Sequence, residues 1–392
     1  MDGKTKRGPI RKRWFGVLAV LLLIGGSLLY RQISRQVNLI GFFVDGSEAT
    51  VFLPDGFTIN VFAEGLNGPR FIHFDAQGRL FVAERGADQV VILIDEDGDG
   101  VADTKRIFAA DLNSPHSLVF RSGAWYVGLP NGIVRLIDQD GDDLVDERTT
   151  LIDDYPTRGH NTRTVEFLPD GRMLVSVGSS CNVCEEDDPR RASVLIYESG
   201  EGGGERIFAS GLRNAVGLSI HPQTGQLWAT NNGRDLMGDD LPPDNIYLIH
   251  EGANYGWPSC HSGVIEDPRF GTPGACEDVV QPVVDLQAHS APLGLVFYTG
   301  DTFPEEYRGD LFVAYHGSWN RSIPTGYKVV RLPFDGTEAG AAVVDFATGW
   351  LEEGNEKVTG RPVGLAVGHD GALYISDDEG GFIYRVQYTR GE

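Results

Sequence analysis

The stretch GHNTRTVEFLPDGRMLVSVG, residues 159–178, contains the pattern that decides the fold of this chain. In its second half, apolar residues occur at every second position in TVEF (Val165, Phe167) and again in MLVSV (Met173, Val175, Val177), and a Pro-Asp-Gly turn separates the two runs. Such alternation around a turn is typical of a β-hairpin with a buried face. Directly before the hairpin lies a polar segment that includes His160 and Arg163.

The same layout occurs six times: a polar lead-in loop, an apolar run, a turn that contains glycine, and a second apolar run. The units are GLNGPRFIHFDAQGRLFVAE (65–84), DLNSPHSLVFRSGAWYVGL (111–129), the stretch quoted above, GLRNAVGLSIHPQTGQLWATN (211–231), HSAPLGLVFYTGDTF to GDLFVAYHG (289–317) and TGRPVGLAVGHDGALYISDD (359–378). A third apolar run follows each unit, for example QVVILID (89–95). Six such repeats predict an all-β, six-bladed β-propeller, and TVFLPDGFTINVFAE (50–64) is expected to supply the strand that closes the ring.

The lead-in loops of a propeller meet at one rim of its central channel, because the first strand of every blade lines that channel. The charged, imidazole and amide side chains in these loops are Arg70, His116, His160, Arg163, Arg213, Asn214, His289 and Arg361. Arginine binds carboxylates and phosphates through paired hydrogen bonds, so this set predicts a pocket for an anion with several acidic groups. The alternative is that these side chains only cap strand ends.

Charge and hydropathy separate the N-terminus from the rest of the chain. The net charge of −23 over 392 residues argues against nucleic acid as a partner, because phosphate binding needs a basic surface. Residues 1–13 are basic, whereas Trp14–Tyr30 is apolar and uncharged. We predict a basic cytoplasmic flank (1–13), an uncleaved transmembrane signal anchor (14–30), a linker (31–49) and an exported propeller (50–390) on the periplasmic or extracellular side. A cleaved signal peptide is the alternative.

The four cysteines form two local pairs in the sequence. Cys181 and Cys184 lie in CNVC, and Cys260 and Cys276 bracket a segment rich in Gly, Pro and Asp. Two local disulfides are the simplest interpretation in an oxidising compartment. A four-cysteine zinc site is the alternative, although the second pair lacks the C-x2-C spacing that such sites use.

Three acidic segments are candidates for cation binding. Asp95–Asp103 (DEDGDGVAD) and Asp138–Asp146 (DQDGDDLVD) place carboxylates at alternate positions, as calcium loops do, but neither has the glutamate that ends an EF-hand loop. They are either weak calcium sites or solvated turns. The long insertion Asn231–Asn245 (NNGRDLMGDDLPPDN) is expected to cover a site or to hold a hard cation.

Several motifs together resemble a known family. GHNTR, GLRNAVGLSIHPQTGQLW, PPDNIYLIHEGANYGWP, HGSWNRSIPTGYKVVRLPF and RPVGLAVGHDGALYISDDEGG are similar to segments of the soluble sugar dehydrogenases that use pyrroloquinoline quinone (PQQ), of the glucose and sorbosone dehydrogenase type. SSCNVCEEDDPRRA resembles the sorbosone-dehydrogenase-like branch. The resemblance covers roughly residues 50–390 and implies a six-bladed propeller that binds the tricarboxylated quinone with calcium over its channel.

The resemblance also implies roles for individual residues. His160 matches the general base, and Arg213 with Asn214 matches the pair beside the quinone carbonyls. The remaining cofactor-binding candidates are Asn232, Arg361, Arg321 near the position of a family lysine, and His116 and Arg163 of the rim. Calcium is expected at the backbone carbonyls around Asn232, Gly233 and Arg234, and a second calcium at Asp244.

Three positions depart from the glucose dehydrogenase pattern. Gly159 replaces an aspartate before the base, Thr359 and Arg361 stand where two arginines lie close together, and Gly233-Arg234 replaces a Gly-Pro. The fold expectation is unaffected, but the substrate and the affinity for the cofactor depend on these positions.

The sequence therefore predicts a quinoprotein oxidoreductase that oxidises the CH–OH or aldehyde group of a sugar, either an aldose or a sorbosone-like compound, and passes the electrons to an external acceptor. Two alternatives remain. A calcium-dependent lactonase-type propeller would hold its metal with side-chain Asp, Glu and Asn at the channel centre. A non-catalytic exported propeller would serve as a binding module and would tolerate change at His160.

Overall fold

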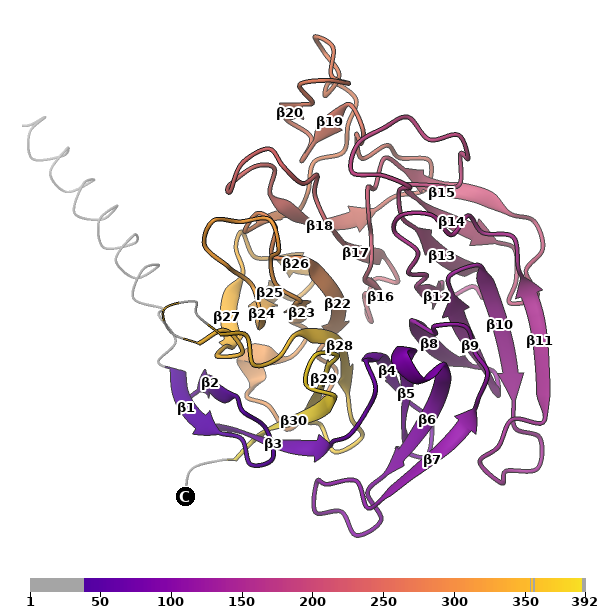
Figure 1. Cartoon of the computed structure of the whole chain (residues 1–392), viewed down its shortest axis with the longest axis vertical. Helices are drawn as coiled ribbons and strands as arrows, with labels where there is room; N and C mark the ends of the chain where they lie inside the picture. Colours follow the sequence, from indigo (N-terminus) through magenta and orange to yellow (C-terminus); the bar gives the residue numbers. More distant parts are fainter. Residues whose placement is uncertain (1–38, 353, 355–356, 390–392) are drawn as a thin grey trace, which may run out of the picture. The chain divides into compact units, whose positions relative to one another are not determined.

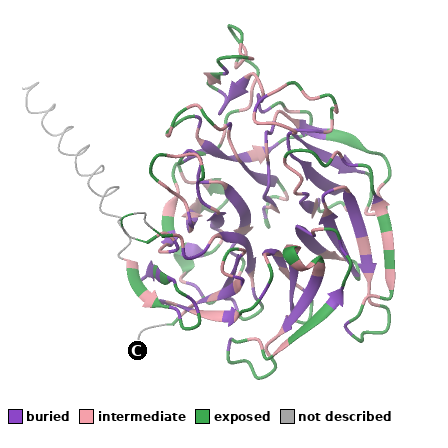
Figure 2. Cartoon of the chain, viewed as in Figure 1, coloured by how far each residue is buried: buried purple, intermediate pink, exposed green. Residues whose placement is uncertain are grey.

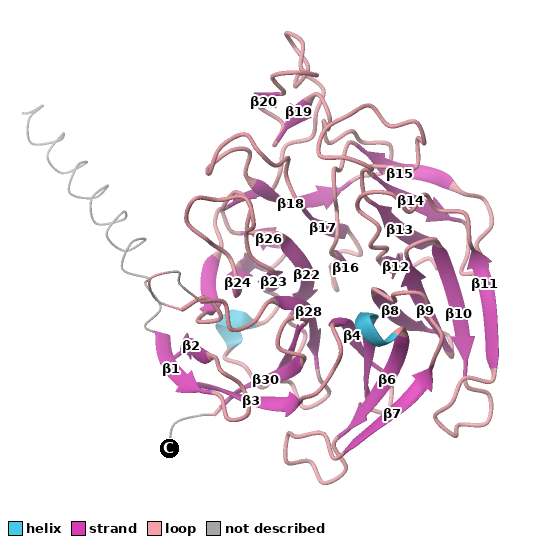
Figure 3. Cartoon of the chain, in the orientation of Figure 1, coloured by secondary structure: helices cyan, strands magenta, loops and turns pink. Residues whose placement is uncertain are grey.

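A computed structural model describes residues 39–352, 354 and 357–389 of the chain (Figure 1). Six four-stranded antiparallel sheets are arranged in a ring as the blades of a propeller (Figures 1 and 3). The innermost strands of neighbouring blades contact one another around the whole ring. The predicted all-β, six-bladed propeller is therefore confirmed.

Each blade runs from an inner strand to an outer strand. Blade 1 contains β4 (Pro69–Phe74), β5 (Leu80–Glu84), β6 (Gln89–Ile94) and β7 (Thr104–Ala109). Blade 2 contains β8 (Ser117–Arg121), β9 (Ala124–Leu129), β10 (Gly132–Ile137) and β11 (Glu147–Ile152). Blade 3 contains β12 (Val165–Phe167), β13 (Met173–Val177), β14 (Ser193–Tyr197) and β15 (Arg206–Ser210).

The remaining blades follow the same order. Blade 4 contains β16 (Leu218–Ile220), β17 (Leu227–Asn231), β18 (Asp244–Ile249) and β21 (Val284–Leu286). Blade 5 contains β22 (Pro292–Phe297), β23 (Leu311–Tyr315), β24 (Lys328–Leu332) and β27 (Val344–Ala347). Blade 6 contains β28 (Pro362–Val367), β29 (Leu373–Asp377), β30 (Phe382–Tyr388) and β3 (Phe57–Ala63).

Short elements complete the described part of the chain. Three further pairs of strands are β1 (Leu39–Phe43) with β2 (Thr50–Pro54), β19 (Cys260–His261) with β20 (Ile265–Glu266), and β25 (Phe334–Asp335) with β26 (Glu338–Ala339). Two 3₁₀ turns are η1 (Arg85–Ala87) and η2 (Glu305–Tyr307) (Figure 3). Among the described residues, no helix is long and apolar enough to cross a membrane.

The middle strands of the blades are more apolar than the outer strands because they are more deeply buried. All five residues of β5, β13, β23 and β29 are buried, because both faces of a middle strand are covered by neighbouring blades (Figure 2). The outer strands β7 and β11 instead carry several exposed residues on the surface of the propeller. The core is accordingly a series of clusters between blades rather than one central cluster.

Ring closure joins the two ends of the propeller by strand pairing. β3 lies beside β30, with Phe57 opposite Tyr388 and Ile59 opposite Val386. The segment 50–64 therefore supplies the closing strand, as predicted from the sequence.

The predicted flank (1–13), the predicted anchor (14–30) and the first part of the predicted linker (31–49) lie outside the described residues. In the described part of the linker, Leu39–Phe43 forms β1. Val44 and Ala49 are buried in the same hydrophobic cluster as residues of β3 and β30, so their apolar side chains attach this segment to the propeller.

Both predicted disulfides are present, Cys181–Cys184 and Cys260–Cys276. Their formation leaves no thiolates for the alternative zinc site. In the acidic segment Asp95–Asp103, the carboxylate of Asp95 accepts hydrogen bonds from the backbone N–H groups of Gly98 (2.8 Å) and Gly100 (2.9 Å). The segment is thus a turn in which a carboxylate binds its own backbone.

Candidate functional site at the channel mouth

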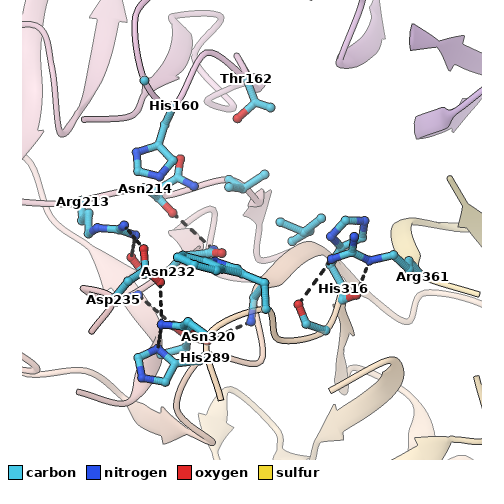
Figure 4. A pocket seen from close by; sticks show the side chains of 18 of the residues that line it. His160, Thr162, Arg213, Asn214, Asn232, Asp235, His289, His316, Asn320 and Arg361 are labelled. Carbon is cyan, nitrogen blue, oxygen red and sulfur yellow. Dashed lines mark hydrogen bonds and ion pairs between the residues drawn. The ribbon is translucent and has the colours of Figure 1, made fainter. Parts of the chain in front are cut away.

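A pocket of about 310 Å³ lies at one mouth of the central channel. Loops of blades 1, 3, 4, 5 and 6 line it, and its charged and imidazole side chains are Arg70, His160, Arg213, Asp235, Asp244, His289, His316 and Arg361. Figure 4 shows His160 and Arg213 on one side of the pocket and His316 with Arg361 on the other. The predicted meeting of lead-in loops at one rim is therefore confirmed for Arg70, His160, Arg213, Asn214, His289 and Arg361.

His160 is held in one orientation by the backbone and the hydroxyl of Ser179. Its Nδ1 lies 3.1 Å from the Ser179 carbonyl oxygen and 3.0 Å from Ser179 Oγ. Because the Ser179 hydroxyl donates to the carbonyl of Cys181 (2.7 Å), both Ser179 oxygens are acceptors for a proton on Nδ1. Burial, and then the positive charge of Arg213, lowers the pKa of His160 to about 4. The imidazole is therefore neutral near pH 7, with Nε2 unprotonated.

Gly159 fits this arrangement because it has no side chain. Its φ of 75° is unfavourable for other residues, and a Cβ at this position would lie 2.4 Å from the carbonyl oxygen of Ser180. An aspartate before His160 would therefore collide with the segment that follows β13. The contact that orients His160 Nδ1 comes from Ser179 instead.

Arg213 is buried beside the pocket and bound on several sides. Its Nη2 donates to Asp235 Oδ2 (2.6 Å), Nη1 donates to the carbonyl of Asn232 (3.3 Å), and Nε donates to the carbonyl of Asn182 (3.0 Å). Burial lowers the pKa of Arg213. The adjacent Asn214 and Asn232 also line the pocket, and Asn232 Nδ2 donates to the carbonyl of Pro292 (2.8 Å).

His316 and Asp378 belong to the site, although neither was predicted from the sequence. His316 lines the pocket, and its Nε2 lies 2.8 Å from Asp378 Oδ1, while Arg70 Nη1 contacts Asp378 Oδ2 at 2.5 Å. Burial lowers the pKa of His316 to about 4. Arg361 Nε donates to the carbonyl of His316 (3.1 Å). One feature of the sequence could have indicated His316 and Asp378. Each directly follows the second strand of its blade, β23 or β29, where the antiparallel chain returns to the rim of the lead-in loops.

Asp235 and Asn320 were also missed, although both line the pocket. Asn320 Nδ2 donates to Asp235 Oδ1 (3.1 Å), and this carboxylate also forms the ion pair with Arg213. Within the described part of the chain, Asn320 Oδ1 is buried and has no hydrogen-bond partner. An acceptor oxygen is therefore unsatisfied at the wall of the pocket.

Two predicted rim residues do not line the pocket, so that expectation needs correction. His116 is only 1% exposed, and its Nδ1 lies 3.4 Å from Arg70 Nε. Arg163 is fully buried and donates to the carbonyls of His160 (3.1 Å) and Pro156 (2.6 Å). Both side chains lie behind the rim, where they support Arg70 and the loop that carries His160.

Arg321 and the Arg234 side chain also lie away from the pocket. Arg321 donates to the carbonyl of Ala288 (3.2 Å) and to the Asp240 carboxylate (3.2 Å), because the acidic Asp239–Asp240 segment attracts it. Arg234 is buried in an ion pair with Asp267. Any contribution of these two positions to a cofactor or a metal would come from the backbone rather than from the guanidinium group.

The predicted calcium segment is partly in the pocket. Gly233 lines it, and a Cβ there would lie 2.9 Å from the carbonyl oxygen of Pro243. The buried Asp244 accepts hydrogen bonds from the N–H groups of Gly233 (2.8 Å) and Ala291 (2.9 Å), and burial raises its pKa to about 6. The insertion Asn231–Asn245 thus contributes to the pocket through Asn232, Gly233, Asp235 and Asp244.

The donor set fits an anion better than the metal of a lactonase-type site. Of the two carboxylates that line the pocket, Asp235 is paired with Arg213, and Asp244 accepts from two backbone amides. Three guanidinium groups, from Arg70, Arg213 and Arg361, surround the same space. Guanidinium groups are the side chains best suited to bind several carboxylates.

Comparisons with known proteins identify relatives of this chain. Residues 45–385 match the family model described as a domain of unknown function, DUF7133. The chain is 28% identical to an uncharacterized protein of Borreliella burgdorferi, over 92% of this chain and 98% of that protein. It is 26% identical to a pyrroloquinoline quinone-dependent pyranose dehydrogenase of Coprinopsis cinerea, over 86% of this chain, and it spans about half (54%) of that enzyme.

A solved structure shares the fold. The holo form of the PQQ domain of pyranose dehydrogenase from Coprinopsis cinerea superposes with a TM-score of 0.76 at 22% identity, over 88% of this chain and 98% of that domain. At this identity the likeness shows the common fold alone. The chain belongs to the DUF7133 family, and its homologues and structural neighbours include PQQ-dependent sugar dehydrogenases.

Proposed function

We propose that this chain is a PQQ-dependent oxidoreductase that oxidises the CH–OH or aldehyde group of a sugar. One observation carries the proposal: in a chain with a net charge of −23, arginine and histidine side chains from five blades line a single pocket. A cluster of this kind favours a ligand with several carboxylates. The homologous PQQ-dependent enzymes support PQQ, with calcium, as that ligand.

The residues of the pocket fit such a cofactor. Arg70 and Arg361 offer guanidinium groups on one side, and Arg213 and Asn214 lie on the other. Oxygen atoms of the Asn232–Arg234 backbone and of Asp244 are of the type that calcium prefers. When bound, PQQ with its calcium supplies a two-electron acceptor for the hydride of the sugar carbon.

His160 is the proposed general base. Its Nδ1 proton is fixed on Ser179, so Nε2 is free to take the proton of the sugar hydroxyl as the C–H bond gives up its hydride. Burial and Arg213 keep the imidazole unprotonated, which is the state that a base requires. The positive charge of Arg213 also stabilises negative charge that develops on an oxygen inside the pocket.

Reconstitution tests this function. The purified chain is incubated with PQQ and Ca²⁺, and sugar-dependent reduction of an artificial electron acceptor is followed. We expect activity that is lost on chelation of Ca²⁺ and that falls at least about 100-fold in His160→Ala, whereas the exposed His250→Ala serves as the matched control. Activity that survives His160→Ala contradicts the base, and absence of quinone uptake by the wild type favours the non-catalytic binding module.

The location of the propeller is a second part of the proposal. We propose that residues 14–30, which are apolar and uncharged, tether residues 50–390 to a membrane. The two disulfides need an oxidising compartment, which supports the periplasmic or extracellular side. The test is the N-terminal sequence of the protein in the membrane fraction and in the non-membrane fraction. A protein in the membrane fraction that starts before Trp14 supports the tether. A protein in the non-membrane fraction that starts after Tyr30 supports a cleaved signal peptide.

A further inference from the structure

The segment that follows β13 contacts both proposed catalytic residues. Residues 179–184 (SSCNVC) connect β13 toward β14 and are closed by the Cys181–Cys184 disulfide. Neither Ser179 nor Asn182 lines the pocket. The segment therefore lies one layer behind the site, where it can act on a ligand only through the side chains that it supports.

Asn182 uses all of its side-chain polar atoms on residues of the pocket. Its Oδ1 accepts from Arg213 Nη2 (3.1 Å) and from the N–H of Asp235 (2.8 Å), and its Nδ2 donates to the carbonyl of Asp235 (2.9 Å). The Asn182 carbonyl also accepts from Arg213 Nε (3.0 Å) and from Trp257 Nε1 (3.2 Å). Two of the three guanidinium nitrogens of Arg213 are thus held by one residue.

The other end of the same segment holds His160. The carbonyl and hydroxyl oxygens of Ser179 face His160 Nδ1, and the Ser179 hydroxyl is itself fixed on the Cys181 carbonyl. The close approach of Ser180 to Gly159 packs the segment against the backbone directly before the imidazole. Because the disulfide closes Cys181–Cys184 into a small ring, the distance between the Ser179 and Asn182 supports is restricted.

We infer that the segment Ser179–Cys184 is the positioning element of the pocket, which sets His160 and Arg213 relative to each other, and that Asn182 is the positioning residue for Arg213. In this chain the segment supplies the orientation that the aspartate before the base is expected to supply in the glucose enzymes. The effect on cofactor binding rests on the proposed function, whereas the restraint of Arg213 can be measured in the protein alone.

The experiment compares Asn182→Ala with Asn60→Ala. Asn60 is a half-buried asparagine far from the pocket that donates to the carbonyls of Val61 (3.1 Å) and Gly100 (2.7 Å), so its variant controls for the loss of an asparagine that anchors backbone. Two readouts are used: the rate at which phenylglyoxal modifies Arg213 in the cofactor-free protein, followed by mass spectrometry, and the affinity for PQQ with Ca²⁺, measured by calorimetry.

We expect Asn182→Ala to speed modification of Arg213 and to weaken quinone binding, each by about tenfold, the size expected when one hydrogen bond to a charged group is lost. Asn60→Ala should leave both within about twofold of wild type. Equal results for the two variants would overturn the inference. If the wild type takes up no quinone, the proposed function fails, and the modification rates alone decide whether Asn182 restrains Arg213.

A second variant covers the case in which Asn182→Ala does not fold. The double substitution Cys181→Ser, Cys184→Ser opens the ring but keeps both the Ser179 and the Asn182 side chains. We expect it to speed modification of Arg213 in the same direction as Asn182→Ala. Wild-type protection of Arg213 in a folded double variant would refute the role of the disulfide-closed segment.

Discussion

At the scale of single residues, the backbone next to His160 has a conformation that only glycine adopts without strain. Gly159 has φ of 75° and lies against the carbonyl of Ser180. The departure from the glucose dehydrogenase pattern at this position is therefore part of a consistent local arrangement. A residue with a side chain here would have to displace the segment that holds His160 Nδ1.

We predict that Gly159→Ala destabilises the protein and reduces activity. The positive φ costs about 1 kcal/mol for a residue with a Cβ, and the close contact with Ser180 adds about 1–3 kcal/mol. Gly98→Ala is the matched control, because Gly98 has φ of 79° and no atom within 4 Å of the added Cβ. Urea unfolding of both variants separates the two costs, and equal destabilisation would show that the contact with Ser180 does not matter.

His160 also predicts a pH dependence. Its pKa in the folded chain, about 4, lies below the ordinary value of 6.5, so the fold disfavours the protonated ring. Below about pH 6.5 the unfolded chain binds the proton more readily than the folded chain does. The free energy of unfolding is therefore highest above about pH 6.5 and decreases as the pH falls toward 4. We expect kcat/KM to hold from neutral pH down to about pH 5 and to fall below it as the base is protonated.

Burial is the main cause of the lowered pKa of His160, and Arg213→Gln tests the second cause, the neighbouring positive charge. Removal of the neighbouring positive charge raises the pKa of His160, so the acidic limb of the pH profile should move to higher pH. The pH at which kcat/KM falls to half of its plateau can be measured even though this variant is expected to be slower at every pH. An unmoved limb would assign the limb to another group, and His316 is then the first candidate because its pKa is also about 4.

At the scale of elements, the insertion between β18 and β21 supports the pocket from behind. It contains β19 and β20 and is closed by the Cys260–Cys276 disulfide. Its Asp267 has a fully buried carboxylate that contacts Arg234 and His261 and accepts from the N–H groups of Arg269 and Phe270. Through Arg234 this carboxylate fixes the backbone that carries Gly233 and Asp235 into the site.

We predict that Asp267→Ala destabilises the chain by about 3–5 kcal/mol, because it leaves the buried Arg234 guanidinium without its counter-charge. Urea unfolding measures this difference, and quinone affinity should fall in the same variant because Gly233 and Asp235 lose their support. The adjacent Glu266→Ala is the control, since Glu266 is exposed. Wild-type stability of Asp267→Ala would show that the insertion does not support the pocket.

At the scale of the whole molecule, the ring is held by strand pairing between its two ends. Phe57 at the start of β3 is 1% exposed, and its ring packs edge-on against Phe303 and Phe346 of blade 5. It therefore stabilises the pairing of β3 with β30 and the contact of blade 6 with blade 5 at once. Since each blade covers its neighbours, loss of closure affects every blade interface.

We predict that Phe57→Ala costs about 3–5 kcal/mol, the usual penalty for removing a buried aromatic ring. Tryptophan fluorescence and far-UV circular dichroism should report one shared urea transition at a lower midpoint, because the ring unfolds as a unit. Phe52→Ala is the control, since Phe52 in β2 is 40% exposed and should change stability little. Separate transitions for the two probes would contradict closure as the source of cooperativity.

The sequence by itself determined the repeat, and with it the fold. Alternation of apolar residues in six hairpins specified six blades and a closing strand. A strand that slipped by one residue would turn its apolar side chains away from the core, so the alternation allows only one register. The same periodicity brought Arg70, His160, Arg213 and Arg361 to one rim. Local spacing also specified both disulfides, because each joins cysteines that are close in the sequence.

Only the tertiary structure decided which polar residues of the rim enter the pocket. His116 and Arg163 have the right position in the repeat, but they are turned behind the rim by contacts with Arg70 and with backbone carbonyls. His316 enters the pocket from the end of a second strand and is held by Asp378, which comes from the next blade. Periodicity fixes where a Cα lies, whereas the direction of a side chain depends on partners far away in the sequence.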